Sequence, residues 1–137
     1  VDRSRPDFAA ALSSACPDGI DVYFDNVGGP LLELVLDRIN VGARIVMCGA
    51  VASYTAEQPL PGPQNLFQIV TKEAHVHGIM THKHADRYDE GRTVLGSWIE
   101  SGALRVPEYV LRGIESVPRA FCDLFRGANF GKTIVEL

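Results

Sequence analysis

The residues best suited to ligand chemistry follow two apolar runs of the sequence. Asn26 comes directly after the run 20–25, and its amide can both donate and accept hydrogen bonds, which suits a polar ligand. The segment 48–54 (Cys-Gly-Ala-Val-Ala-Ser-Tyr) follows the second run. Gly49 would let a ligand approach the backbone closely, while Ser53 and Tyr54 supply hydroxyls. The alternatives are an Asn26 that caps its own turn and a strand-ending turn with an exposed Tyr54.

The elements around these residues have the spacing of a strand–helix–strand unit. Residues 20–25 and 44–48 are short runs of strand-forming residues, and Gly28-Gly29 allows a sharp turn after the first. Residues 29–40 have apolar side chains at i, i+3, i+4 and i+7, which predicts an amphipathic helix. This order predicts parallel strands joined by a right-handed crossover. Ligands bind at the carboxyl ends of such strands, where Asn26 and residues 48–54 lie.

The rest of the chain continues this alternation. We expect a long loop at 50–62, and helix N-caps at Asp7 and Ser116. The other predicted elements are helix 8–15, helix 63–71, strand 74–80, helix 85–101, strand 109–113, a helix from residue 117, and strand 133–137.

Composition limits the possible partners. The chain has 137 residues and a formal net charge of −4, which does not favour nucleic acid or an anionic membrane surface. No apolar run approaches the roughly 20 residues that span a bilayer, and residues 1–6 lack the apolar segment of a signal peptide. The three cysteines are far apart, which suits a reducing cytoplasm better than a disulfide framework.

Four histidines lie in or just after the predicted strand 74–80. His75 and His77 would share one strand face, with His82 and His84 following. A metal site is one interpretation, but carboxylate and cysteine support is poor, and polar residues on an edge strand explain the pattern better. We therefore expect no metal site.

Four motifs, in order, resemble one protein family: Phe24-Asp-Asn-Val-Gly-Gly29, residues 48–54, Gly62-Pro-Gln-Asn65 and Gly127-Ala-Asn-Phe-Gly-Lys132. The chain resembles the C-terminal part of the medium-chain dehydrogenase/reductase superfamily. The similarity is to its zinc-independent branch of prostaglandin reductases, alkenal double-bond reductases and curcumin reductase.

The resemblance implies an α/β fold. Residues 1–101 would form the second half of a Rossmann-type parallel sheet, and residues 102–137 a C-terminal segment that belongs to the catalytic domain. Family members are more than twice as long, and their Gly-rich pyrophosphate loop would lie upstream of Val1.

The resemblance also implies an NADP site and assigns cofactor contacts, but no catalytic residue and no metal ligand. Tyr54 is a candidate donor to the enolate-like oxygen of the transition state, a task that the cofactor ribose could perform instead. Ile79 departs from the aromatic residue common in the branch, and Asn129 has an αL turn as its alternative. The implied cofactor contacts are Asn26, Cys48, Gly49, Ala50, Val51, Ala52, Ser53, Tyr54, Ile79, Met80, Thr81 and Asn129.

The implied function is NADPH-dependent reduction of the C=C bond of small α,β-unsaturated ketones or aldehydes by hydride transfer in the cytoplasm. We expect the intact protein to be the enzyme and the 137 residues alone to be inactive. A homodimer through strand 74–80 is the expected assembly. The alternatives are a quinone reductase or another zinc-free member of the superfamily, or a non-catalytic oligomerising fragment.

Overall fold

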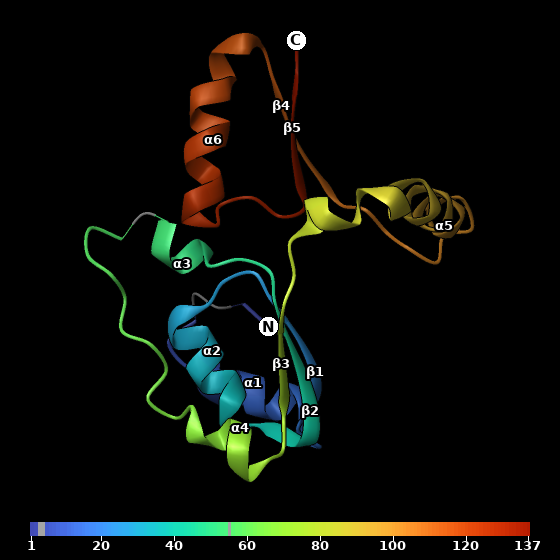
Figure 1. The fold of residues 1–137 in the computed structure, drawn as a ribbon. Helices are drawn as coiled ribbons and strands as arrows, with labels where there is room; N and C mark the ends of the chain where they lie inside the picture. Colours follow the sequence, from blue (N-terminus) through green and yellow to red (C-terminus); the bar gives the residue numbers. More distant parts are fainter. Residues whose placement is uncertain (3–4, 55) are drawn as a thin grey trace. The chain divides into compact units, whose positions relative to one another are not determined.

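A computed structural model describes residues 1–2, 5–54 and 56–137 (Figure 1). The chain divides into two compact units, Val1–Lys83 (unit 1) and His84–Leu137 (unit 2). This division reflects packing within the chain. The assignment of residues 102–137 to a catalytic domain remains a prediction.

Unit 1 is built on a three-stranded parallel sheet. Its strands are β1 (Ile20–Asp25), β2 (Ile39–Met47) and β3 (His75–Gly78), in the order β1-β2-β3. In the register of the sheet, Tyr23 lies opposite Ile45, and Ile45 lies opposite Val76. The predicted α/β fold with parallel pairing is confirmed, and the three strands end at the same edge.

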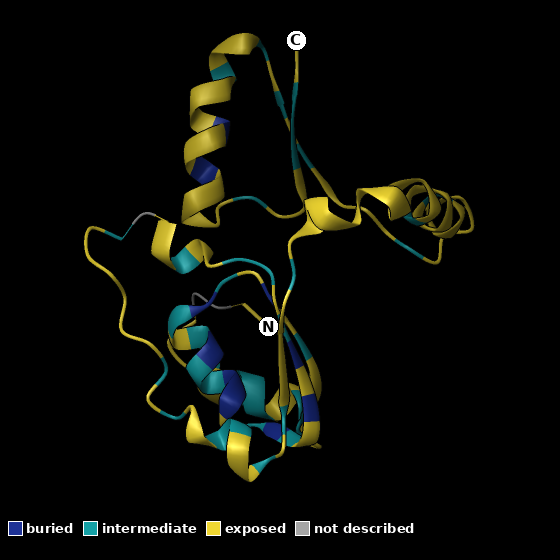
Figure 2. Ribbon diagram, viewed as in Figure 1, coloured by how far each residue is buried: buried dark blue, intermediate teal, exposed yellow. Residues whose placement is uncertain are grey.

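Helices cover one face of this sheet, as Figure 1 shows for α1 (Phe8–Ala15), α2 (Gly29–Leu36) and α4 (Phe67–Thr71). The core lies between α2 and β2, where most of the buried residues of unit 1 lie in Figure 2. Leu12 of α1 and Ile69 of α4 pack against this core from its margins. The core residues are Leu32, Val35, Leu36, Ile39, Ala43 and Ile45.

The helix predicted over residues 29–40 is too long. Helix α2 ends at Leu36, and β2 already begins at Ile39, which lies opposite Ile20 in the sheet. Ile39 is buried, so it continues the apolar stripe in the sequence while belonging to a strand. Pairing with β1 outweighs the helical periodicity because it satisfies backbone groups and buries the side chain at once.

Most of the other predicted elements occur with bounds that differ by a few residues, and one turn is added. The predicted loop 50–62 contains a one-turn helix, α3 (Val51–Tyr54). The helix predicted from residue 63 begins only at Phe67, and the strand predicted over 74–80 spans His75–Gly78. Apart from α3, these differences lie at element ends, where local sequence signals are weakest.

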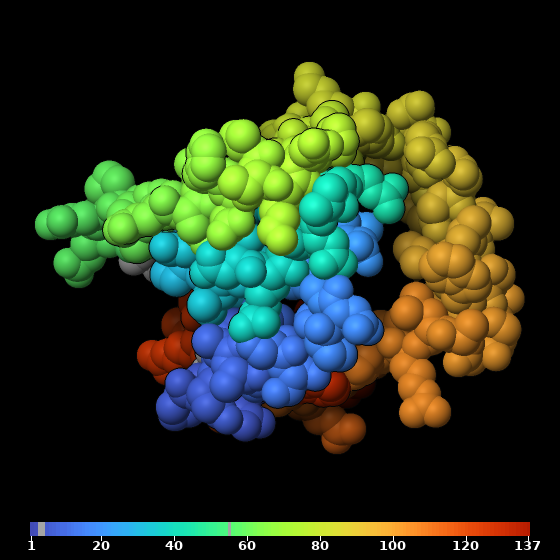
Figure 3. Space-filling view, turned by 90° about the horizontal axis from the view of Figure 1, so that it is seen from below, coloured from blue at the N-terminus to red at the C-terminus, as the bar shows by residue number. Residues whose placement is uncertain are grey.

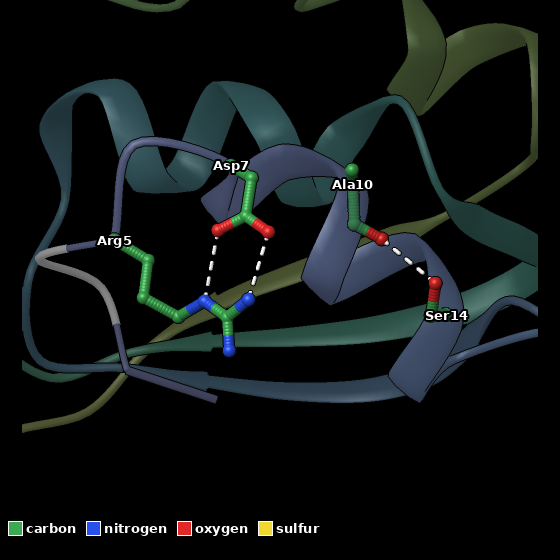
Figure 4. Close-up of polar contacts among 4 residues, drawn as sticks. All are labelled: Arg5, Asp7, Ala10 and Ser14. Carbon is green, nitrogen blue, oxygen red and sulfur yellow. Dashed lines mark hydrogen bonds and ion pairs between the residues drawn. The ribbon is translucent and has the colours of Figure 1, made fainter.

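Asp7 does not cap α1. Its carboxylate accepts two hydrogen bonds from the Arg5 guanidinium, from Nε at 2.8 Å and from the terminal nitrogen Nη2 at 2.7 Å (Figure 4). This pairing lowers the pKa of Asp7 and raises that of Arg5. A nearby guanidinium thus takes the acceptor that the predicted cap would have used.

The segment before α4 is tied to α2 by one side chain. The Asn65 amide donates to the Glu33 carbonyl at 2.8 Å and to the Asp37 carboxylate at 2.7 Å. Figure 3 shows the residues around α4, in green and yellow-green, lying over those of α2 and β2. The segment just before α4 is therefore anchored to the C-terminal half of the core helix.

Unit 2 contains a two-stranded parallel sheet and two helices. Its sheet pairs β4 (Glu108–Arg112) with β5 (Lys132–Glu136). The hydroxyl of Ser116 donates to the Gly113 carbonyl at 2.8 Å instead of capping the helix that follows. The remaining elements are η1 (Thr81–Arg87), which crosses the unit boundary, α5 (Tyr88–Glu100), η2 (Ile114–Ser116) and α6 (Val117–Arg126).

None of the helices within the described ranges is long and apolar enough to cross a membrane.

Candidate cofactor site at the carboxyl ends of the strands

Backbone hydrogen bonds join the ends of the strands of unit 1. The amides of Cys48 and Gly49 donate to the Asp25 carbonyl at 2.8 and 3.1 Å, which fastens the end of β2 to the end of β1. The amide of Ile79 donates to the Met47 carbonyl at 2.9 Å and continues the connection to β3. Three chain segments far apart in sequence thus meet at one edge of the sheet.

The turn after β1 also holds the segment after β2. The amide of Val51 donates to the Asn26 carbonyl, and the amide of Ala52 donates to the Val27 carbonyl, both at 3.0 Å. The sequence places these two segments more than twenty residues apart, and the structure brings them together as predicted. Asn26 and residues 48–54 therefore form one continuous wall, called here the strand-end wall.

The amide of Asn26 is available to a ligand. Asn26 is exposed, and within the part of the chain that the structure describes no hydrogen bond engages its side chain. The alternative in which Asn26 caps its own turn is therefore wrong. An exposed group that can both donate and accept, at the carboxyl edge of a parallel sheet, is suited to bind a polar ligand.

Asp25 closes the turn instead, a role that sequence analysis missed. Its buried carboxylate oxygen Oδ1 accepts from the amides of Val27 and Gly28, both at 2.8 Å, and from the Tyr23 hydroxyl at 3.0 Å. Burial raises the pKa of Tyr23, and the hydrogen bond to Asp25 raises it further. The signal was present in the sequence, because Asp commonly accepts from amides two or three residues ahead.

Two glycines shape the turn, as the sequence predicts. Gly28 and Gly29 have φ angles of +68° and +56°, and residues other than glycine rarely adopt positive φ angles. Gly49 is needed for space instead, since a Cβ atom there would lie 3.2 Å from the Asn26 carbonyl oxygen. At these three glycines the turn after β1 and the segment after β2 can pack closely together, which forms the strand-end wall.

Ser53 and Tyr54 lie on helix α3 (Val51–Tyr54) and interact with the residue that precedes it, Ala50. The Ser53 hydroxyl donates to the Ala50 carbonyl at 2.7 Å, and the Ala50 amide donates to the Tyr54 hydroxyl oxygen at 3.4 Å. Because the Tyr54 hydroxyl only accepts here and its residue is 65% exposed, its proton remains available to an external acceptor.

A pocket of about 340 Å³ adjoins the wall. The start of α2 lines one side, residues 47–53 a second, and the proline-rich stretch 59–63 a third. Its lining is mostly apolar, which suits an organic ring or chain better than a second charged group. The lining residues are Val27, Gly28, Gly29, Leu32, Met47, Gly49, Ala50, Ser53, Pro59, Leu60, Pro61, Gly62 and Pro63.

The remaining predicted contacts are dispersed. Ile79 is half-buried beside the end of β2, Met80 is exposed, and Thr81 begins η1. Asn129 belongs to unit 2, where its amide donates to the Gly131 carbonyl at 3.0 Å. Its φ is not positive, so the αL alternative is wrong for Asn129.

The histidines do not form a metal centre in the described ranges. His75 and His77 are exposed on β3. Leaving residues 3, 4 and 55 aside, no group of three or more His, Cys, Asp or Glu side chains is placed to hold a metal ion. The donors among these described residues therefore do not fit a zinc ion.

Comparison with known proteins relates the chain to a dehydrogenase family. The family model described as "Zinc-binding dehydrogenase" matches residues 1–135. The NADPH-dependent curcumin reductase of Escherichia coli (strain K12) is 35% identical over 142 residues, covering 100% of this chain and 41% of that protein. Prostaglandin reductase 1 of Rattus norvegicus is 36% identical over 127 residues, covering 92% of this chain and 39% of that protein.

Comparison with solved structures relates the chain to the same group of reductases. CurA from Vibrio vulnificus, crystallised in complex with NADPH, superposes with a TM-score of 0.86 at 34% identity, covering 99% of this chain and 42% of that chain. The chain thus spans about two fifths of the length of the proteins it matches. The chain belongs to the zinc-binding dehydrogenase family, among the zinc-independent members of the medium-chain dehydrogenase/reductase superfamily.

Proposed function

We propose that this chain is the C-terminal portion of an NADPH-dependent reductase that saturates the C=C bond of small α,β-unsaturated ketones or aldehydes. The observation that carries the proposal is the strand-end wall, in which the free amide of Asn26 stands beside residues 48–54 at the carboxyl edge of a parallel sheet. The likeness to CurA, solved with NADPH, supports NADPH as the cofactor.

The wall fits a nicotinamide cofactor in its chemistry. Asn26 would bind a polar group of the cofactor, and Gly49 would let the backbone approach it without obstruction. Residues 79–81 would complete the contacts that unit 1 offers. When bound, NADPH supplies the hydride that adds to the β-carbon of the substrate.

Tyr54 is the side chain best placed to help the substrate. Its hydroxyl accepts from the Ala50 amide and keeps its own proton for donation. A donor aimed at the carbonyl oxygen would stabilise the negative charge that develops there during hydride addition. No residue is assigned as a catalytic residue, and no step runs through a metal ion.

The test is a chimera in which residues 1–137 replace the matching segment of E. coli curcumin reductase. NADPH oxidation is followed with a simple enone, an alkenal and a quinone. The proposal predicts turnover with the first two, whereas turnover with the quinone alone would favour the quinone-reductase alternative. Absence of NADPH binding by a folded chimera would overturn the proposal.

Asn26→Ala tests the wall itself in this chimera. Loss of a polar contact should weaken NADPH binding by about tenfold. Asn40→Ala is the matched control, because the Asn40 amide is bound to the Asp18 carbonyl and the Asp21 carboxylate at the amino end of the sheet. Equal NADPH affinities for the two variants would show that Asn26 does not contact the cofactor.

The proposed assembly is a homodimer through β3. This strand lies at the edge of the sheet, and all four of its residues are exposed. A lysine on an edge strand blocks strand–strand association, so Val76→Lys should convert a dimer to a monomer in sedimentation velocity. Val70→Lys, on α4, is the control and should leave the dimer intact.

The cytoplasm is the proposed compartment. Its support is that the three cysteines, Cys16, Cys48 and Cys122, are free.

A further inference from the structure

Asp25 is a fully buried charged residue that the proposed function does not use. It is 0% exposed, and three donors converge on its oxygen Oδ1: the Tyr23 hydroxyl and the amides of Val27 and Gly28. Hydrogen bonds to a charged acceptor are stronger than neutral ones, so this carboxylate strongly favours one conformation of the turn.

The turn held by Asp25 in turn holds helix α3. The Asn26 and Val27 carbonyls, which lie within this turn, accept from the amides of Val51 and Ala52. The backbone carbonyl of Asp25 also accepts from Cys48 and Gly49. A single residue therefore connects the turn bearing Asn26 with the helix bearing Tyr54.

The second carboxylate oxygen of Asp25 has a different environment from the first. Within the described ranges, Oδ2 is buried and has no hydrogen-bond partner. An unpartnered buried oxygen costs stability, and a native structure with such an atom calls for a compensating role.

We propose that Asp25 is a positioning residue that sets the geometry of the strand-end wall for the cofactor. It does not touch the cofactor, because it is inaccessible to solvent. It acts through the turn 26–28 and through the two carbonyls that hold α3. The inference rests on the proposed function for its ligand, but its structural step can be measured without one.

The first test is amide hydrogen exchange in the 137-residue chain. Asp25→Ala should speed exchange by at least about tenfold at Val27 and Gly28, and also at Val51 and Ala52, whose amides donate to backbone carbonyls and not to the replaced carboxylate. The amide of Ile45 in the central strand reports global opening and should change less. An unchanged rate at Val51 and Ala52, or an equal change at all five amides, would overturn the proposal.

Two further variants complete this test. Asp25→Asn keeps the shape and one acceptor oxygen, so it should partly retain the protection that Asp25→Ala loses, and it serves if the alanine variant does not fold. Asp21→Ala is the matched control, since Asp21 lies on the same strand but accepts from Asn40 at the other end of the sheet. It should leave the amides of Val51 and Ala52 unchanged.

The second test measures NADPH in the curcumin reductase chimera. Asp25→Ala should raise the KM for NADPH by about tenfold, with kcat changed much less, and Asp25→Asn should lie between it and the unmodified chimera. An unchanged KM in a chimera that binds NADPH would overturn the positioning role. If the unmodified chimera binds no NADPH, the proposed function fails, and the exchange rates still decide whether Asp25 sets the wall.

Discussion

Two adjacent polar residues at the end of β1 have different roles. Asp25 points into the protein and binds the turn, while Asn26 is exposed with its amide unengaged. Asp25 is the last residue of β1, and Asn26 opens the turn that follows. The pair thereby places a structural acceptor and a ligand-binding amide one residue apart.

Gly28→Ala tests the turn at the residue scale. The backbone of Gly28 (φ +68°, ψ −157°) is open essentially to glycine alone, so alanine should lower the free energy of unfolding by about 1–3 kcal/mol. Chemical denaturation of both proteins measures the difference. Gly62→Ala is the control, because a Cβ atom there would meet nothing within 4 Å. Equal losses in the two variants would contradict the assigned strain.

Because of Tyr23, the stability of unit 1 should depend on pH in the alkaline range. Its pKa in the folded chain is raised by burial and by the Asp25 carboxylate, so folding favours the neutral phenol. That stabilisation is fully present below about pH 10, the ordinary pKa of tyrosine, and is lost as the pH rises above it. Unfolding free energies measured from pH 8 to 11.5 should therefore fall more steeply in the unmodified chain than in Tyr23→Phe. Parallel curves would show that Tyr23 titrates normally.

At the scale of elements, α2 and β2 form most of the packed interior. Leu36 is 1% exposed, and Leu36→Ala should lower the free energy of unfolding by about 2–5 kcal/mol, through lost apolar burial and the cavity left behind. Leu66→Ala is the matched control, because Leu66 is 51% exposed and should cost far less. Thermal and urea unfolding of both variants measure the contrast. A comparable loss from the Leu66 variant would mean that the core is not centred on α2.

The same core explains why the helix prediction failed at its end. Leu32, Val35, Leu36 and Ile39 are all buried, and their spacing fits a helix in the sequence. Only the pairing of Ile39 with Ile20 shows that the last of them belongs to β2. Periodicity identifies residues that are buried, but it does not identify which element buries them.

At the scale of the whole molecule, the two units differ in how much they bury. Of the hydrophobic residues that are buried in the described ranges, all but Ala120 lie in unit 1. Unit 2 leaves apolar side chains of α6 exposed, including Phe121, Leu124 and Phe125. A unit with few buried contacts opens at a lower free-energy cost.

Limited proteolysis should reveal this difference. Dilute protease should cut within His84–Leu137 first and leave a fragment containing Val1–Lys83, which mass spectrometry of the early products identifies. Proteolysis of opened states follows their population, so the less buried unit should be cut sooner. First cuts within the sheet of unit 1 would contradict this order.

The sequence by itself determined the α/β class, the parallel strand order along the chain and the positions of the two glycine-rich strand ends, because these follow from short-range patterns of apolar, β-branched and glycine residues. The sequence also identified the family, because four motifs occur in the order that is typical of its members. Tertiary structure alone decided that Asp25 rather than Asn26 closes the turn, that Asp7 pairs with Arg5, and that residues 51–54 form a helix held by the turn after β1. These outcomes depend on which donors and acceptors meet in space, and residues distant in sequence supply several of them.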